Sequence, residues 1–110
     1  MKKDVNVFLG HILEAIVDIE SFIRNVKKET FLKNKEKQNA VVRSLEVIGE
    51  AVKNIPDDFR KKNNNIPWKE IVGMRDKIMM NYFGIDLELI WKTIKRDIPE
   101  LKKELGKYEI

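Results

Sequence analysis

Apolar residues recur at three- and four-residue intervals along most of this chain, which is the spacing of one face of an α-helix. Between residues 4 and 26 the stripe consists of Val5, Phe8, Leu9, Ile12, Leu13, Ile16, Ile19, Phe22 and Ile23. From about Glu36 to Asn54 a second stripe consists of Ala40, Val41, Ser44, Leu45, Val47, Ile48, Ala51 and Val52, with Ile55 just beyond it. The pattern predicts two long amphipathic helices, separated by the charged residues 27 to 30.

Prolines and capping residues indicate where shorter helices begin. Pro56 cannot continue the second helix, and Asp57 and Asp58 are predicted to cap a short helical piece after it. Three successive asparagines then indicate a loop. Pro67 opens a third helix that is predicted to run to Tyr82, because proline fits the first turn, where its missing N–H costs nothing.

The last quarter of the chain carries helix signals as well. Gly84 is a candidate left-handed residue at the end of the third helix, and Asp86 is placed to cap the segment 87–95. Asp97 and Pro99 are expected to restart a short terminal helix. These signals predict two or three shorter helices after the two long ones.

The helical pattern extends over the whole chain. No window alternates polar and apolar residues as a strand does, so the sequence predicts an all-α fold. A chain of 110 residues with these helices is expected to form a single domain, residues 1–110, folded as an antiparallel four- to five-helix bundle. Gly49 lies in the middle of the second long helix, where glycine costs about 1 kcal/mol relative to alanine. We therefore expect another helix to pack closely against Gly49.

Composition narrows the range of functions. Hydrophobic residues make up 43% and charged residues 36%, so a packed core with a densely charged surface is expected. The absence of cysteine excludes disulfides and thiolate sites, and a single histidine, His11, excludes a histidine metal cluster within one chain. Neither a signal peptide nor a run of about 20 apolar residues is present, so we expect a cytoplasmic protein that does not enter a membrane. The net charge of +4 fits a polyanion partner but is common on lysine-rich surfaces.

A cation, an acid, an amide and a phenol lie close together near the end of the third helix. On a helix Arg75 and Tyr82 return to the same side, while Asp76 and Met80 stack one turn apart, next to Asn81. The planar arginine fork suits phosphate oxygens, and the tyrosine hydroxyl can donate, accept or be modified. On spacing alone an ordinary alternative remains open, in which Arg75 and Asp76 form surface ion pairs and the methionines fill the core.

The order of these residues resembles the signature of the HEPN toxins of the HepT type, which reads Arg, a polar residue, three further residues, His, one residue and Tyr. Arg75, Asp76 and Tyr82 match this signature, while Met80 stands at the histidine position. The likeness extends in unbroken order over roughly residues 8 to 102. It is carried by residues 11–16, 44–51, 66–78 and 82–86, by Trp91 and by residues 98–101.

The resemblance implies a homodimeric ribonuclease that cuts RNA in a cleft shared by two copies, without a metal or another cofactor. In that family Arg75 would hold the phosphate, Asp76 would orient the site, and position 80 would supply the imidazole for proton transfer. Met80 has no proton to exchange. Since a general acid or base typically contributes about 10² to 10⁴-fold, this copy is expected to be a weak or inactive endoribonuclease.

The resemblance also implies a partner. In related toxins the tyrosine at the position of Tyr82 accepts AMP from a nucleotidyltransferase antitoxin of the MNT type, which uses ATP, and the added charge beside Arg75 would obstruct phosphate binding. Two alternatives stay open: a non-catalytic HEPN binding module that pairs with a nucleotidyltransferase, and a basic helical protein that binds RNA through charge. His11 is expected to be a partly buried residue of the first helix with no catalytic role.

Overall fold

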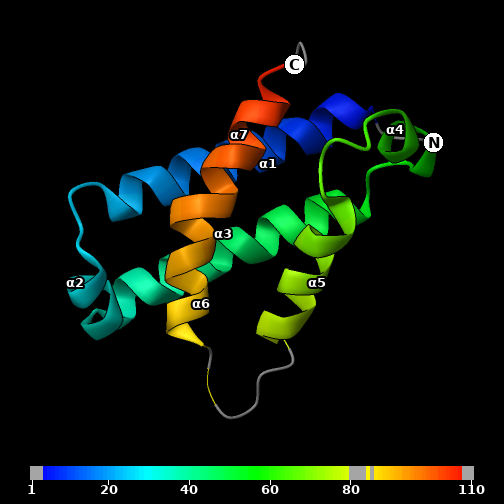
Figure 1. Cartoon of the computed structure of the whole chain (residues 1–110). Coiled ribbons are helices and arrows are strands. Elements are labelled where there is room, and N and C mark those ends of the chain that lie inside the picture. Colours follow the sequence, from blue (N-terminus) through cyan, green and yellow to red (C-terminus); the bar gives the residue numbers. More distant parts are fainter. Residues whose placement is uncertain (1–3, 80–83, 85, 108–110) are drawn as a thin grey trace.

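The computed structural model describes residues 4–79, 84 and 86–107, and all regular structure in this part of the chain is helical. The helices run in the order α1 (Val5–Ile23), α2 (Lys28–Lys33), α3 (Lys35–Lys53), α4 (Asp57–Lys62), α5 (Trp68–Met79), α6 (Leu87–Lys92), the π-helical turn η1 (Thr93–Asp97) and α7 (Ile98–Leu105) (Figure 1). The predicted all-α fold is confirmed. Its main parts are the helices α1, α3 and α5 and the continuous helical segment α6–η1–α7, which we call the C-terminal rod. Among the described helices, none is long and apolar enough to cross a membrane.

Helices α1 and α3 pack side by side in opposite directions, as the two apolar stripes predicted (Figure 1). The turn between them is fixed by Phe31 in α2, which is fully buried. Asn34 then caps α3, because its side chain accepts a hydrogen bond of 3.0 Å from the backbone N–H of Lys37. The Lys37 ammonium group in turn donates to the carbonyl of Phe22 at 2.9 Å, which ties the start of α3 to the end of α1.

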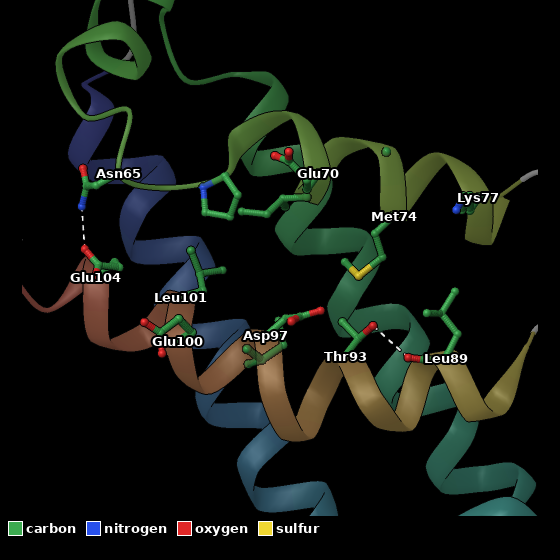
Figure 2. A pocket seen from close by; sticks show the side chains of 14 residues that line it. Asn65, Glu70, Met74, Lys77, Leu89, Thr93, Asp97, Glu100, Leu101 and Glu104 are labelled. Carbon is green, nitrogen blue, oxygen red and sulfur yellow. Dashed lines mark hydrogen bonds between the residues drawn. The ribbon is translucent and has the colours of Figure 1, made fainter.

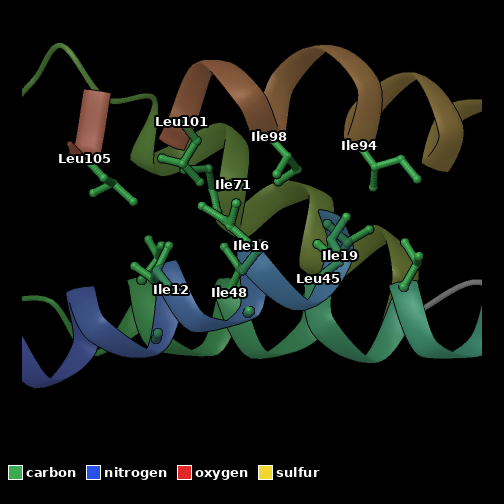
Figure 3. Packing of buried hydrophobic residues seen from close by; sticks show 14 of the residues in the cluster. Ile12, Ile16, Ile19, Leu45, Ile48, Ile71, Ile94, Ile98, Leu101 and Leu105 are labelled. Carbon is green, nitrogen blue, oxygen red and sulfur yellow. The ribbon is translucent and has the colours of Figure 1, made fainter. Parts of the chain in front are cut away.

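Helix α5 crosses α3, and the C-terminal rod α6–η1–α7 closes the core from the other side (Figures 1 and 3). Trp68 anchors the start of α5: it is buried, and its indole N–H donates to the carbonyl of Asn63 at 3.1 Å. The shared core contains Ile12, Ile16 and Ile19 of α1, Leu45 and Ile48 of α3, Ile71 of α5, and Ile94, Ile98, Leu101 and Leu105 of the rod (Figure 3). Proline at position 67 therefore begins the third helix as predicted.

The expected restart of a terminal helix at Asp97 is wrong. Asp97 keeps helical backbone angles and its side chain makes no capping hydrogen bond, so the rod continues through it. The π-helical turn explains how: the N–H of Ile98 donates to the carbonyl of Thr93, five residues back. This wider turn lies directly before Pro99, the second residue of α7, which has no N–H to donate.

Of the other two predicted caps, one is present and one is absent. Asp86 does cap α6, since its carboxylate accepts from the backbone N–H of Leu89 at 3.1 Å. Asp57 and Asp58 do not cap α4; they lie within its first turn, after Pro56, and neither makes a capping hydrogen bond. Gly84 has a φ of +122°, a conformation that other residues rarely adopt, in agreement with the turn expected there.

Candidate functional site

Arg75 lies on the face of α5 that packs against α3. The buried residues of α5 include Trp68, Ile71 and Ile78, and Arg75 falls within the same stripe, with only 20% of its side chain exposed. The close approach depends on Gly49 of α3, because a Cβ built on Gly49 would overlap the Cβ and Cγ of Arg75. The prediction that a helix packs closely on Gly49 is confirmed, and the arginine stem fills the space.

Four charged side chains from α3 and α5 form a continuous network around this arginine. The Nη2 atom of Arg75 lies 3.1 Å from Oε2 of Glu50, and its Nη1 atom lies 3.2 Å from Oδ1 of Asp76. The same Oδ1 atom lies 3.4 Å from the ammonium nitrogen of Lys53. The network alternates in sign and sums to zero, so each charge has an opposite neighbour.

The electrostatics of the network centre on Asp76. The hydrogen bond from Arg75 holds the pKa of the Asp76 carboxyl below its usual value, and Lys53 acts in the same direction, while partial desolvation opposes both. Asp76 is therefore an anion at neutral pH and cannot serve there as a proton donor. It can only accept hydrogen bonds and fix the orientation of the guanidinium group.

The guanidinium group has unused hydrogen-bonding capacity. Its Nε atom is buried and has no hydrogen-bond partner among the described residues. Its Nη2 atom faces Glu50, whose side chain is 58% exposed and can rotate into solvent. The Arg75 side chain is largely buried, but its carboxylate partner lies at the surface, where an incoming anion can compete with it. The arrangement is a preoriented cation suited to a phosphate group.

Arg75 and Asp76 are hydrogen-bonded to each other in the structure, whereas Met80 and Tyr82 lie outside the described residues. Glu50 and Lys53 were not predicted to belong to the site. Their positions on α3 offered a signal, because both follow a mid-helix glycine and lie three residues apart on one face.

His11 lies elsewhere, on the outside of α1. It is exposed, and its ring stands edge-on to Phe8 with 6.3 Å between the ring centroids, so the expectation of a partly buried histidine is wrong. Its neighbours in a shallow hollow between α1 and α3 include Glu14, Asp18 and Arg43. Within the described residues no group of three or more histidine or acidic side chains is arranged to hold a metal ion.

Comparison with known proteins connects this geometry to a family. The family model described as "Ribonuclease HepT-like" matches residues 12–108. "Probable ribonuclease HepT" of Thermococcus cleftensis is 50% identical over 109 residues, which cover 99% of this chain and 96% of that protein. A Methanocaldococcus jannaschii protein with a provisional RNase name is 53% identical over 106 residues, covering 96% of this chain and 88% of that protein.

A longer relative from Methanocaldococcus jannaschii is named for two activities, gamma-glutamylcyclotransferase and, provisionally, RNase. It is 50% identical over 107 residues, which cover 97% of this chain, and the matched part spans only 48% of that relative. No solved structure gives a significant match to this chain. The matched residues include Glu50, Lys53, Arg75 and Asp76, so the whole network lies within the region covered by the family model.

Proposed function

Because the chain belongs to the HepT-like ribonuclease family, we propose that it is the toxin component of a HEPN/MNT toxin–antitoxin system, built on an endoribonuclease scaffold that needs no metal. The observation that supports the proposal is the guanidinium group of Arg75, which α3 and α5 hold in one orientation with its Nη2 atom on the exposed Glu50 carboxylate. A bound RNA phosphate would take the place of the exposed Glu50 carboxylate. The protein acts in this proposal as a cytoplasmic homodimer whose two copies contribute to one cleft.

The proposed reaction is attack of a ribose 2′-oxygen on the adjacent phosphorus, with release of the 5′-oxygen. Arg75 stabilises the negative charge that gathers on the phosphoryl oxygens, and Asp76 keeps the guanidinium group oriented. A proton must leave the 2′-hydroxyl and another must reach the departing oxygen. Met80 occupies the position from which the family's histidine would exchange these protons, and a thioether cannot do so. This copy therefore binds the phosphate and cleaves weakly or not at all.

Cleavage of a mixed-sequence RNA in the presence of a chelator tests this assignment. Met80→His should raise the cleavage rate by about 10² to 10⁴-fold over the natural chain. Met80→Gln is the matched control, since it adds a polar group that does not titrate near neutrality. Arg75→Ala in the Met80→His background should abolish the gain. If Met80→His stays inactive while its fold and oligomeric state are unchanged, position 80 has no acid–base role and the proposal fails.

The proposed partner is a nucleotidyltransferase antitoxin that modifies Tyr82. In the transfer the tyrosine oxygen attacks the α-phosphorus of ATP, the bond to the β-phosphate breaks, pyrophosphate leaves, and the phenolic proton is lost. The chain itself needs no cofactor, because ATP is consumed by the partner. The attached phosphate would carry negative charge near Arg75 and occupy the cation that RNA needs.

Mass spectrometry tests the modification. Incubating the chain with the candidate nucleotidyltransferase and ATP should add one or more AMP groups, and Tyr82→Phe should prevent the addition. Tyr108→Phe is the matched control, because Tyr108 is the other tyrosine of the chain. Modification that persists in Tyr82→Phe, or that is lost equally in Tyr108→Phe, would contradict the assignment.

The second candidate function is a non-catalytic HEPN module that binds a nucleotidyltransferase. The observation that favours it is Met80, because loss of the acid–base group leaves phosphate recognition without chemistry. A stable complex with the nucleotidyltransferase, without modification and without cleavage by Met80→His, would favour the module. A purely charge-driven RNA binder is a third possibility, and its binding should survive Arg75→Ala while falling steeply with salt.

A further inference from the structure

A groove of about 590 Å³ lies between α5 and the C-terminal rod (Figure 2). Its apolar lining is formed by Pro67, Ile71, Met74, Leu89, Ile98 and Leu101. Leu89 in this lining is 42% exposed. The groove thus offers apolar surface that the described part of the chain leaves open to water.

Acidic side chains surround this apolar surface. Glu70 on α5 and Asp97 on the rod lie on opposite sides of the groove, and Glu100 and Glu104 continue the acidic edge toward the end of α7 (Figure 2). Among the described residues that line the groove, Lys77 is the one cation. Glu104 already has partners, Lys107 at 3.0 Å and Asn65.

The other three acids have no such neutralisation. No ion pair between described residues involves Glu70, Asp97 or Glu100, and all three are exposed. Among the described lining residues, three acids without an ion pair therefore stand against one lysine, and the groove is locally negative although the whole chain carries a net charge of +4.

We propose that this groove is the docking site for a basic amphipathic helix of a protein partner. Apolar side chains of such a helix would cover Met74 and Leu89, and its lysine or arginine residues would meet Glu70, Asp97 and Glu100. The rod presents residues 89–104 to the groove, a length of about 22 Å at helical rise, which suits a helix of about 15 residues.

A second copy of this chain suits the groove less well. In a two-fold contact the same patch meets itself, so the acidic edges of two copies would face each other. Repulsion between like charges opposes such a contact, whereas a basic helix gains from the same charges.

The groove also lies on the helix that carries Arg75, and Met74 and Lys77 line it within two residues of that arginine. Docking here does not depend on ribonuclease activity.

Binding of a labelled synthetic peptide to the full chain tests the proposal. The probe is a helix of about 16 residues with leucines on one face and lysines on the other, and the control probe carries glutamates in place of the lysines. Fluorescence anisotropy should show saturable binding of the basic peptide only. The triple variant Glu70→Gln, Asp97→Asn and Glu100→Gln should weaken this binding about tenfold, since three exposed charge pairs are lost.

Two matched controls separate the groove from the rest of the surface. Glu14→Gln with Asp18→Asn neutralises acids on α1 and should leave peptide binding unchanged. Leu89→Ala should weaken binding about fivefold, whereas Val17→Ala, at an exposed apolar residue of α1, should not. Thermal unfolding of each variant verifies that the fold is kept.

Three results would overturn the proposal. One is equal binding of the acidic and basic peptides. Another is peptide binding that the groove variants leave intact. The third is conversion of a dimer to a monomer by Leu89→Asp in sedimentation velocity, because the groove would then be occupied by a second copy.

Discussion

Replacing Gly49 with alanine should separate α3 from α5 and displace Arg75. The new Cβ would overlap the Cβ and Cγ of Arg75. These atoms are at the root of the side chain, so a rotamer change at its far end cannot relieve the overlap and the helix backbones must move. Overpacking of this kind typically costs about 1–3 kcal/mol. The intrinsic gain from alanine within a helix offsets about 1 kcal/mol of that cost.

The net expectation for Gly49→Ala is destabilisation by about 0–2 kcal/mol, once the helix propensity gain is subtracted from the packing cost. Gly10→Ala is the matched control, because a Cβ on Gly10 of α1 meets nothing within 4 Å. It should stabilise the protein by up to about 1 kcal/mol. The informative quantity is the difference between the two variants, about 1–3 kcal/mol, measured by urea unfolding with equal m-values.

A double-mutant cycle assigns the penalty to the arginine stem. Arg75→Gly removes both the Cβ and the Cγ atoms that the new methyl group would overlap, so Gly49→Ala should cost less in that background. The free energy lost with the ion pairs of Arg75 is the same whether position 49 is glycine or alanine, so it cancels in the cycle. Equal stabilisation by Gly49→Ala and Gly10→Ala would refute the close packing of Arg75 on α3, and with it the preoriented cation.

Three further outcomes follow from single contacts. Because its hydrogen bond from Arg75 lowers the pKa of Asp76, the carboxylate stabilises the fold above the ordinary aspartate range and loses this effect as the pH falls through the lowered value. The melting difference between the natural chain and Asp76→Asn should therefore be largest near neutrality and close in acid; a difference independent of pH would contradict the assigned hydrogen bond. Glu50→Gln should change stability by less than about 1 kcal/mol yet tighten binding of a short RNA measured by anisotropy, since a competing anion is removed, and weaker binding would count against phosphate exchange at Arg75. Asp86→Ala should cost about 1 kcal/mol in urea unfolding while Asp86→Asn, which keeps a capping oxygen, should be nearly neutral; equal losses would show that the cap of α6 contributes little.

The helices could be predicted from sequence because each depends on periodicity along one segment. The two long stripes gave α1 and α3 to within a few residues, and Pro67 marked the start of α5. Individual caps were harder. Asp86 and Asp97 look alike in sequence, but Asp86 has extended backbone angles and Asp97 has helical ones. An aspartate caps a helix only where its own backbone leaves the helical conformation. A π-helical turn can keep that backbone helical even near a proline, and no cap then forms.

The candidate site was predicted only where its residues are neighbours in sequence. Arg75 and Asp76 are adjacent, and their pairing follows from α5 alone. Glu50 and Lys53 join them because α3 and α5 cross at Gly49, and the crossing point is a property of packing between helices. Periodicity identifies the buried face of each helix, but it does not specify which residues of two helices meet.

The network also bears on the proposed role of position 80, where this chain has methionine. A guanidinium group cannot exchange protons near neutral pH, and the lowered pKa of Asp76 keeps that carboxylate ionised, so neither group replaces an acid–base imidazole. In the proposed function Arg75 and Asp76 orient the phosphate. If that proposal holds, phosphate binding and proton transfer should respond to different substitutions. Binding of RNA should depend on Arg75 and Gly49, whereas cleavage should depend in addition on the residue at position 80.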